Sequence, residues 1–444
     1  MNRNDRAIVA LVMLAHGMVH TYELAIPIFV TIWLDAFTAI DLGITTVGVT
    51  EATLGVVVTA GYALFGIGAL PGGVLVDRVG SRRLIVACLF GMAGSFVLLA
   101  LSPGLVTVAF ALLVWGAAAS VYHPSGLALI SKGVEERGSG FAYHGIAGNL
   151  GIGFGPLATT LLLLFVDWRT VAALLAVPAL IAGVYATRAS FDESAAVESA
   201  AADGGSPPEG ESTDGGSKAD AGVESLAEFF GESKRLFAGG FLAVFLVVIC
   251  SGLYYRGVLT FLPELLSGFP GFEPIPLSRF LPGEIGAGRT IAPERYFYSG
   301  LLLLGVIGQF VGGKLTDRVR LEYGIVAAFG VLAVLALVFL PVAALGLAPL
   351  LAVGAVLGVM LFVVQPFYQA TVAEYTPTGT RGLSYGFTYL GVFGVGALGG
   401  AVAGAILTFA TPTVLFGTLA AFAAVASLTG LFLVRRGFDA RTAA

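Results

Sequence analysis

The sequence predicts an all-α integral membrane protein whose twelve transmembrane helices form two pseudo-symmetric six-helix bundles. Three observations support this prediction: an apolar composition, twelve long apolar runs, and patterns that recur in the two halves of the chain. Hydrophobic residues make up 57% of the 444 residues and charged residues only 11%, whereas a soluble domain carries about 25% charged residues. A water-soluble fold of this length has too little interior to bury so much apolar surface.

The apolar runs have the length of membrane-spanning helices, because about 20 residues cross the hydrocarbon core. They do not alternate as the strands of a barrel do. Most of the 62 glycines lie inside the runs, where small residues let helices pack closely. The predicted spans are 7–33, 50–75, 84–101, 105–131, 139–165, 170–189, 236–266, 295–315, 324–342, 346–373, 382–410 and 412–434.

The basic residues predict the orientation of the chain. If the N-terminus is cytoplasmic, most of the 23 Lys and Arg residues fall on the cytoplasmic side, as the positive-inside rule requires. Both termini are then cytoplasmic, and we expect the protein in the plasma membrane. The first apolar run is too long for a signal peptide and lacks a clear small-residue cleavage site, so we expect it to remain as the first span.

An acidic segment divides the spans into six and six. Residues 191–234 are rich in Gly, Ser and Ala and poor in aliphatic residues, a composition typical of a disordered or weakly helical linker. We therefore expect an N-terminal six-helix bundle over 1–190, an acidic cytoplasmic linker over 191–234, and a C-terminal six-helix bundle over 235–444.

The two halves repeat each other. His20 precedes Pro27 by seven residues in the first span, and Arg256 precedes Pro263 by seven in the seventh. Repeats of this kind indicate two bundles related by an axis along the membrane normal, with the ligand site near the midplane between them. A second match lies at the end of the second span of each half and in the loop that follows it. It pairs Gly68 with Gly308, Gly72 with Gly312, Gly73 with Gly313, Asp77 with Asp317, and Arg78 with Arg318.

The loop "GGVLVDRVGSRR" after the second span resembles a signature of the major facilitator superfamily, Gly-x-x-x-Asp-Arg/Lys-x-Gly followed by basic residues. The resemblance implies the major facilitator fold and a gating role for this loop in alternating access. A role in anchoring the topology alone would explain the arginines but not a buried acid. The residues implied in gating are Gly73, Asp77, Arg78, Gly80, Arg82 and Arg83, with Gly313, Asp317 and Arg318 in the second copy.

A narrower resemblance lies in spans four and five. The segments "SVYHPSGLALIS" and "RGSGFAYHGIAGNLGIGFGP" are similar to the fosmidomycin-resistance type of efflux protein, which implies export of a small organic compound. That group commonly has His-x-x-x-Asp in its first span, where this chain has His16-x-x-x-His20. The acid is therefore absent from that position or moved to Glu23.

The first span carries an unusual polar stretch, "HGMVHTYELAIP". His16, His20 and Glu23 follow each other at i, i+4 and i+7 and so share one helix face. A charge that faces lipid costs at least about 2.5 kcal/mol, so this face should turn toward a cavity or a neighbouring helix. Histidine suits proton transfer because small changes around it switch its charge near neutral pH.

Other polar residues fall on spans that line the cavity in the resembled family. Glu23 can pair with Arg256 on the seventh span, or Arg256 can bind an anionic substrate. A structural role, in which these groups only hydrogen-bond helix to helix, remains open. The predicted substrate and proton cavity consists of His16, His20, Glu23, His123, His144, Arg256, Tyr255, Gln365, Gln369 and Tyr389.

No phosphate loop, metal cluster or nucleophile arrangement stands out, so we expect no enzyme activity, cofactor, metal or nucleic-acid partner. The expected partners are a small-molecule substrate, protons and the lipid bilayer, with the protein as a monomer. We predict proton-coupled export of a small organic compound by alternating access. The alternatives are proton-coupled import of a small organic anion and a membrane sensor or scaffold that does not transport.

Overall fold

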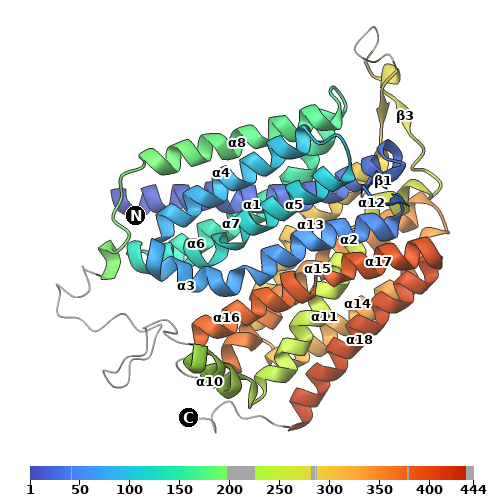
Figure 1. Ribbon diagram of the computed structural model, residues 1–444. Coiled ribbons are helices and arrows are strands. Elements are labelled where there is room, and N and C mark those ends of the chain that lie inside the picture. The colour runs from blue at the N-terminus through green and yellow to red at the C-terminus, as the bar shows by residue number, and fades with distance from the viewer. Residues whose placement is uncertain (42, 198–225, 282–285, 287, 378–379, 437–444) are drawn as a thin grey trace.

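The computed structural model describes residues 1–41, 43–197, 226–281, 286, 288–377 and 380–436 (Figure 1). Among these residues, twelve helical segments are long and apolar enough to cross a membrane. The predicted all-α membrane fold with twelve spans is therefore confirmed. Short strands occur only in the loops of the described chain, as the hairpins β1–β2 and β3–β4.

The first half of the chain supplies six spans. Two of them consist of two consecutive helices. The elements are α1 (Arg3–Ala36), β1 (Ala39–Asp41), β2 (Thr46–Gly48), α2 (Glu51–Ile67) with α3 (Ala69–Val79), α4 (Ser81–Ala100), α5 (Leu105–Ser120) with α6 (Tyr122–Gly133), α7 (Arg137–Leu163) and α8 (Trp168–Arg188).

The second half supplies the other six spans and one helix that precedes them. Its eleventh span contains a π-helical turn, η2. The elements are α10 (Leu226–Phe237), α11 (Phe241–Leu259), α12 (Leu262–Ser267), β3 (Ile275–Pro276), η1 (Leu277–Arg279), β4 (Thr290–Ile291), α13 (Pro293–Thr316), α14 (Leu321–Ala343), α15 (Leu347–Glu374), α16 (Arg381–Tyr389) with η2 (Leu390–Val395) and α17 (Leu398–Phe409), and α18 (Pro412–Arg436).

The span expected over 236–266 is divided in the structure, and this prediction of one continuous run was wrong. The transmembrane helix α11 ends at Leu259, and the short helix α12 begins at Leu262. Pro263 lies in the first turn of α12, where its missing N–H is no loss and its fixed φ favours a new helix start. Most of the predicted linker, 198–225, lies outside the described residues, and α10 begins where that gap ends.

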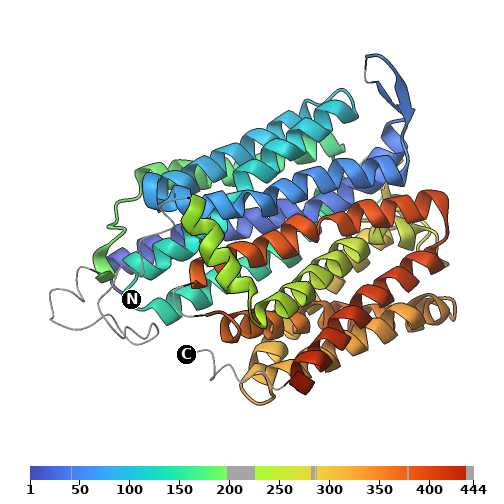
Figure 2. The same cartoon turned by 60° about the horizontal axis from the view of Figure 1, so that its bottom comes forward.

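The helices pack as two groups that follow the halves of the chain. In the first half α1 packs on α7, α4 on α8, and α2 on α5; in the second half α13 packs on α15 and α14 on α18. The two groups meet along α2 with α17 and along α7 with α13. Figures 1 and 2 show the blue-to-green helices on one side of this junction and the yellow-to-red helices on the other.

The two ends of the bundle differ. We call the end where α1 begins and α18 ends the terminal face, and the opposite end, which carries both hairpins, the hairpin face (Figure 1). Near the hairpin face, the Ala52 N–H donates to Thr408 Oγ1 over 2.8 Å, and Thr408 donates to Glu51 Oε2 over 3.1 Å. A Cβ on Gly404 would lie 2.1 Å from the Glu51 carbonyl oxygen. These contacts join α2 to α17 and close the halves against each other at this end.

A glycine face on α7 brings that helix against α1. A Cβ added to Gly151 would lie 2.3 Å from the Gly17 carbonyl oxygen, and one on Gly155 would lie 2.6 Å from Thr21 Cα. One on Gly148 would lie 2.4 Å from His16 Cε1. Because van der Waals packing replaces the hydrophobic drive between membrane helices, these glycines fix how close α7 comes to the polar face of α1.

Candidate functional site

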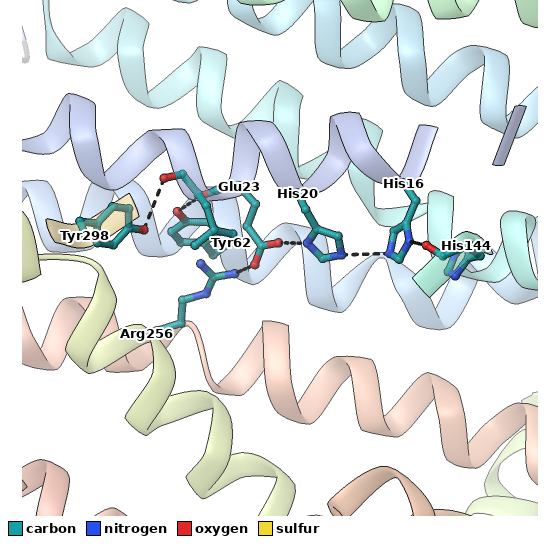
Figure 3. A network of polar contacts seen from close by, with 8 residues as sticks. His16, His20, Glu23, Tyr62, His144, Arg256 and Tyr298 are labelled. Carbon is teal, nitrogen blue, oxygen red and sulfur yellow. Dashed lines mark hydrogen bonds and ion pairs between the residues drawn. The ribbon is translucent and has the colours of Figure 1, made fainter. Parts of the chain in front are cut away.

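A proline leaves one backbone carbonyl of α1 without its helical donor. This carbonyl lies in the polar centre of α1, the stretch that carries His16, His20 and Glu23. Pro27 lies inside the helix and has no N–H to donate to the carbonyl of the residue four positions earlier, which is Glu23. Buried carbonyls need a partner, and here the Tyr62 hydroxyl donates to the Glu23 carbonyl oxygen over 2.6 Å. The free carbonyl thus ties α1 to α2 beside the ionisable side chains (Figure 3).

A continuous chain of polar contacts runs along the inner face of α1 (Figure 3). Arg256 of α11 pairs with one oxygen of the Glu23 carboxylate. The other oxygen of Glu23 lies 2.5 Å from His20 Nδ1, and His20 Nε2 lies 3.0 Å from His16 Nε2. His16 Nδ1 in turn lies 2.7 Å from the carbonyl oxygen of His144 on α7. The structure therefore links both halves of the chain through buried ionisable groups.

Arg256 is held by one acid and by aromatic rings. Its side chain is almost completely buried, and its Cζ lies 3.7 Å from the centroid of the Tyr62 ring and 5.5 Å from that of Tyr255. Such cation–π contacts stabilise a desolvated guanidinium. Its Nε has no hydrogen-bond partner. Arg256 therefore has one buried hydrogen-bond donor without an acceptor.

All four histidines of the chain lie together in this centre. The ring of His144 stacks on His16 with centroids 3.8 Å apart, and the ring of His123 on α6 lies 5.3 Å from His16. His123 also stacks on Tyr389 of α16 at 4.8 Å, which brings a second contact across the two halves. Each histidine is less than 10% exposed.

The structure brings together most of the residues that the sequence pointed to. His16, His20 and Glu23 face inward with Arg256, and Tyr255 and Tyr389 border them. Two predicted residues stand apart from the chain of polar contacts: Gln365 is half-buried and Gln369 is exposed.

Three tyrosines of the centre escaped the sequence analysis. Tyr62 holds the Glu23 carbonyl, Tyr298 donates to the Leu24 carbonyl oxygen over 3.4 Å, and Tyr122 donates to the Val12 carbonyl oxygen over 2.6 Å. Tyr122 also stacks on His16 at 5.4 Å. The position of Pro27 predicts that the Glu23 carbonyl needs a hydrogen-bond donor from outside the helix. It does not predict which helix supplies that donor, which is Tyr62 of α2.

Three histidines lie close enough together to raise the question of a metal ion. Nitrogens of His16, His20 and His123 all lie within 4.8 Å of one another. Two nitrogens bound tetrahedrally to zinc at about 2.0–2.1 Å would lie about 3.3 Å apart. The observed Nε2–Nε2 distance of 3.0 Å is that of a hydrogen bond, so His16 and His20 contact each other directly.

The loop that carries the predicted gating motif contacts α8 of its own half and, through α3, α16 of the other half. Gly80 has φ of 90°, a conformation that favours glycine, and it turns the chain from α3 into α4. Arg82 donates from Nε and Nη2 to the carbonyls of Ala186 and Thr187, both over 2.9 Å. The side chain of Asp77 lies outside the described part of the structure. The remaining motif residues are half-buried or exposed at the terminal face: Gly73, Arg78, Arg83, Gly313, Asp317 and Arg318.

A groove of about 560 Å³ opens near the terminal face between α1 and the start of α7. Met13 lies at its inner part and precedes His16 by three residues, so both fall on one side of α1. The groove therefore approaches the polar centre from the terminal face. Its lining residues are Met1, Arg6, Val9, Ala10, Met13, Glu136, Ser139 and Tyr143.

Comparison with solved structures gives transporters of the same architecture. A bacterial homologue of the human lysosomal transporter Spinster, inward-facing and unoccupied, has a TM-score of 0.65 at 14% identity, with 100% of this chain and 97% of that chain covered. A peptide transporter POT in complex with sulfate has a TM-score of 0.66 at 14% identity, with 97% and 95% covered. A variant of the nucleoside transporter NupG has 0.69 at 11%, with 97% and 100% covered.

At these identities the solved structures show a shared fold only. No curated protein matches the sequence. The model of the Major Facilitator Superfamily matches residues 9–389, which is most of the chain and includes the polar centre and helices of both groups. The chain belongs to the Major Facilitator Superfamily.

Proposed function

We propose that this protein is a secondary active transporter that exports a small organic compound by alternating access, driven by protons that move inward. The observation that supports this proposal most strongly is the ion pair between Glu23 on α1 and Arg256 on α11. It joins the first transmembrane span of each half and continues into a pair of histidines.

This ion pair gives a physical reason for proton coupling. A buried charge whose partner is removed is strongly destabilising, so the halves cannot separate at Glu23 and Arg256 without a replacement charge or proton. Proton uptake by the histidines beside the carboxylate supplies that replacement on α1. Histidines serve this purpose because their charge changes in the physiological pH range.

The two faces of the molecule indicate the side to which this conformer opens. Hydrogen bonds join α2 to α17 near the hairpin face, and the groove beside α1 opens near the terminal face. The distribution of basic residues supports a cytoplasmic terminal face, with both termini on that side. A conformer open toward the cytoplasm is the one in which an exporter loads its substrate and an importer releases it, so the proposal of export rests on the resemblance to the fosmidomycin-resistance type.

The proposal also gives a role to the two motif loops. The helix groups 1–190 and 235–444 move as rigid bodies, and the loops around Asp77 and Asp317 stabilise one of the two alternating conformations at the cytoplasmic face. The contacts of Arg82 with the end of α8 anchor the first of these loops to its own group, as a gate element needs.

Inside-out membrane vesicles test the proposal. Fosmidomycin and a panel of labelled organic compounds are offered outside, and the lumen is made acidic. An exporter that exchanges protons for substrate accumulates at least one compound in the acidic lumen and loses this accumulation when the pH gradient is dissipated. Accumulation that is indifferent to the gradient would contradict proton coupling.

A second candidate function is proton-coupled import of a small organic anion. It is favoured by the unpartnered Nε of Arg256, a buried donor that an anionic group can accept from. In the same inside-out vesicles an importer would instead carry preloaded anion outward when the lumen is acidic. The direction of gradient-driven movement therefore separates the two functions, and no movement of any compound would favour the sensor or scaffold.

A further inference from the structure

The two hydrogen-bonded histidines of α1 have a defined proton arrangement. His16 Nδ1 lies 2.7 Å from a backbone carbonyl oxygen, that of His144. A carbonyl oxygen only accepts hydrogen bonds, so the hydrogen is on His16 Nδ1. A neutral imidazole carries one N–H, and the Nε2 of a neutral His16 therefore presents a lone pair.

The same reasoning applies to His20. Its Nδ1 lies 2.5 Å from Glu23 Oε2, while the other carboxylate oxygen pairs with Arg256. An arginine partner favours the ionised carboxylate, which only accepts, so the hydrogen is on His20 Nδ1. The Nε2 of a neutral His20 is then also without hydrogen.

These two Nε2 atoms face each other at 3.0 Å. Two lone pairs at that distance repel, and neither ring can change tautomer without losing its bond to an oxygen. One added proton resolves the conflict, because it turns the contact into an N–H···N hydrogen bond of ordinary length. We propose that His16 and His20 share one proton between their Nε2 atoms and that this is the proton the transporter exchanges for substrate.

The surroundings fit a shared positive charge. Glu23 is the one carboxylate of this network among the described residues, and it receives His20 Nδ1–H as well as Arg256. The titratable rings that contact the pair directly are Tyr122 and His123 on α6 and His144 on α7. Beyond them, Tyr62 on α2 and Tyr255 on α11 lie against Arg256, and Tyr389 on α16 lies against His123.

The site links proton binding to the position of the halves. Glu23 serves two cations, Arg256 and the protonated histidine pair. When Arg256 moves away with its half, the carboxylate acts on the histidine pair alone and the proton is held more tightly. When Arg256 returns, Glu23 again pairs with it, and the histidine pair binds its proton less tightly. Because such coupling is reciprocal, binding of the proton favours separation at this point, which is the linkage a proton-driven transporter requires.

Nuclear magnetic resonance on the full-length protein, labelled with ¹⁵N-histidine and reconstituted in lipid nanodiscs without a histidine tag, tests this directly. The chain has only four histidines, so each ring is assignable. We expect hydrogen on Nδ1 of both His16 and His20, with a through-hydrogen-bond coupling between their Nε2 nuclei that disappears as pH is raised. An Nε2–H tautomer of either ring, or no coupling at any pH, would overturn the proposal.

Two controls separate this site from other causes. His144 bonds His16 through its backbone, so His144→Phe keeps the acceptor and a stacked ring and should retain the Nε2 coupling, whereas His16→Phe should lose it. Addition of EDTA should leave the spectrum unchanged. Nε2 signals that shift on chelation and again on addition of Zn²⁺ would show that a metal occupies the site in place of the proton.

The role of the proton rests on the proposed function and has its own test. The pH at which the Nε2 coupling is half lost should equal the midpoint at which pH-driven flux into proteoliposomes falls. Different midpoints would show that the coupling proton binds elsewhere. A coupled histidine pair together with flux that ignores the pH gradient would contradict the proposed function but not the shared proton.

Discussion

At the scale of single residues, the site depends on a carbonyl that proline leaves without a donor. Pro27 frees the Glu23 carbonyl, and Tyr62 satisfies it over 2.6 Å. The same tyrosine ring lies under the guanidinium of Arg256. One side chain therefore positions both members of the ion pair, through its hydroxyl and through its ring.

Tyr62→Phe separates these two roles, because it removes the hydroxyl and keeps the ring. The buried carbonyl of Glu23 then lacks a partner, which costs about 1–3 kcal/mol. We expect a loss of that size in the free energy of unfolding, measured in detergent by chemical denaturation. Tyr298→Phe is the matched control, since its bond to Leu24 is long at 3.4 Å, and a cost equal to that of Tyr62→Phe would contradict this account.

The ion pair predicts an asymmetry between single and double variants. Glu23→Gln leaves the buried Arg256 without its counter-charge, which costs about 3–5 kcal/mol of stability. Adding Arg256→Gln removes the unpaired charge, so the double variant should unfold at a higher denaturant concentration than Glu23→Gln alone. A double variant less stable than the single one would show that the two side chains do not depend on each other.

At the scale of elements, the glycine face of α7 holds the histidines of α1 in place. Gly148→Ala would put a methyl group 2.4 Å from His16 Cε1, and overpacking of this kind costs about 1–3 kcal/mol. We expect the variant to be destabilised and to show altered ¹⁵N shifts of His16. Gly145→Ala on the same helix is the control, because a Cβ there meets nothing within 4 Å. Equal effects of both substitutions would contradict this packing.

The element scale also shows what the sequence can and cannot predict. The twelve spans follow from apolar length alone, and the inward direction of His16, His20 and Glu23 follows from their shared helix face and the cost of charge in lipid. The break between Leu259 and Leu262 was missed because the sequence stays apolar across it, although Pro263 marks the new start. Tyr62 was missed because its partner is a backbone carbonyl 39 residues away in sequence.

The π-helical turn η2 is another feature that the apolar composition of its span does not predict. It covers Leu390–Val395 inside the eleventh span, directly after Tyr389, whose ring stacks on His123. A Cβ on Gly66 of α2 would lie 2.0 Å from the backbone nitrogen of Gly394 in this turn. Such turns recur at functional sites, and here the turn lies where the two halves touch beside the histidines.

At the scale of the whole molecule, an acidic group controls how the hairpin face responds to pH. Burial, together with the negative charges of Asp35, Glu51 and Glu294, raises the pKa of Glu264 on α12 to about 7, while Arg295 opposes this shift. A folded pKa above the usual value of about 4.3 means that the folded protein binds the proton more tightly. The stabilisation is therefore present below about pH 4.3 and is lost as pH rises through 7.

Glu264→Gln should remove this pH dependence. Between pH 5 and pH 8 we expect the thermal unfolding midpoint of the unaltered protein to fall more than that of the variant, so that the two curves diverge most near pH 8. The measurement is differential scanning fluorimetry in detergent. Parallel curves across that range would show that Glu264 does not keep its proton in the folded state.

The central claim is that the buried chain from Arg256 through Glu23 to the histidines couples protons to the movement of the two halves. Its most direct measurement compares two fluxes in proteoliposomes, accumulation driven by a pH gradient and exchange without one, for the unaltered protein, Glu23→Gln and Glu322→Gln. Glu322 is a buried acid that accepts a hydrogen bond from Tyr375 and takes no part in the contacts between Arg256, Glu23 and the histidines. It therefore serves as the control. We predict that Glu23→Gln loses gradient-driven accumulation far more than exchange, while Glu322→Gln keeps their ratio. Gradient-driven accumulation that survives Glu23→Gln at the unaltered level would contradict the account.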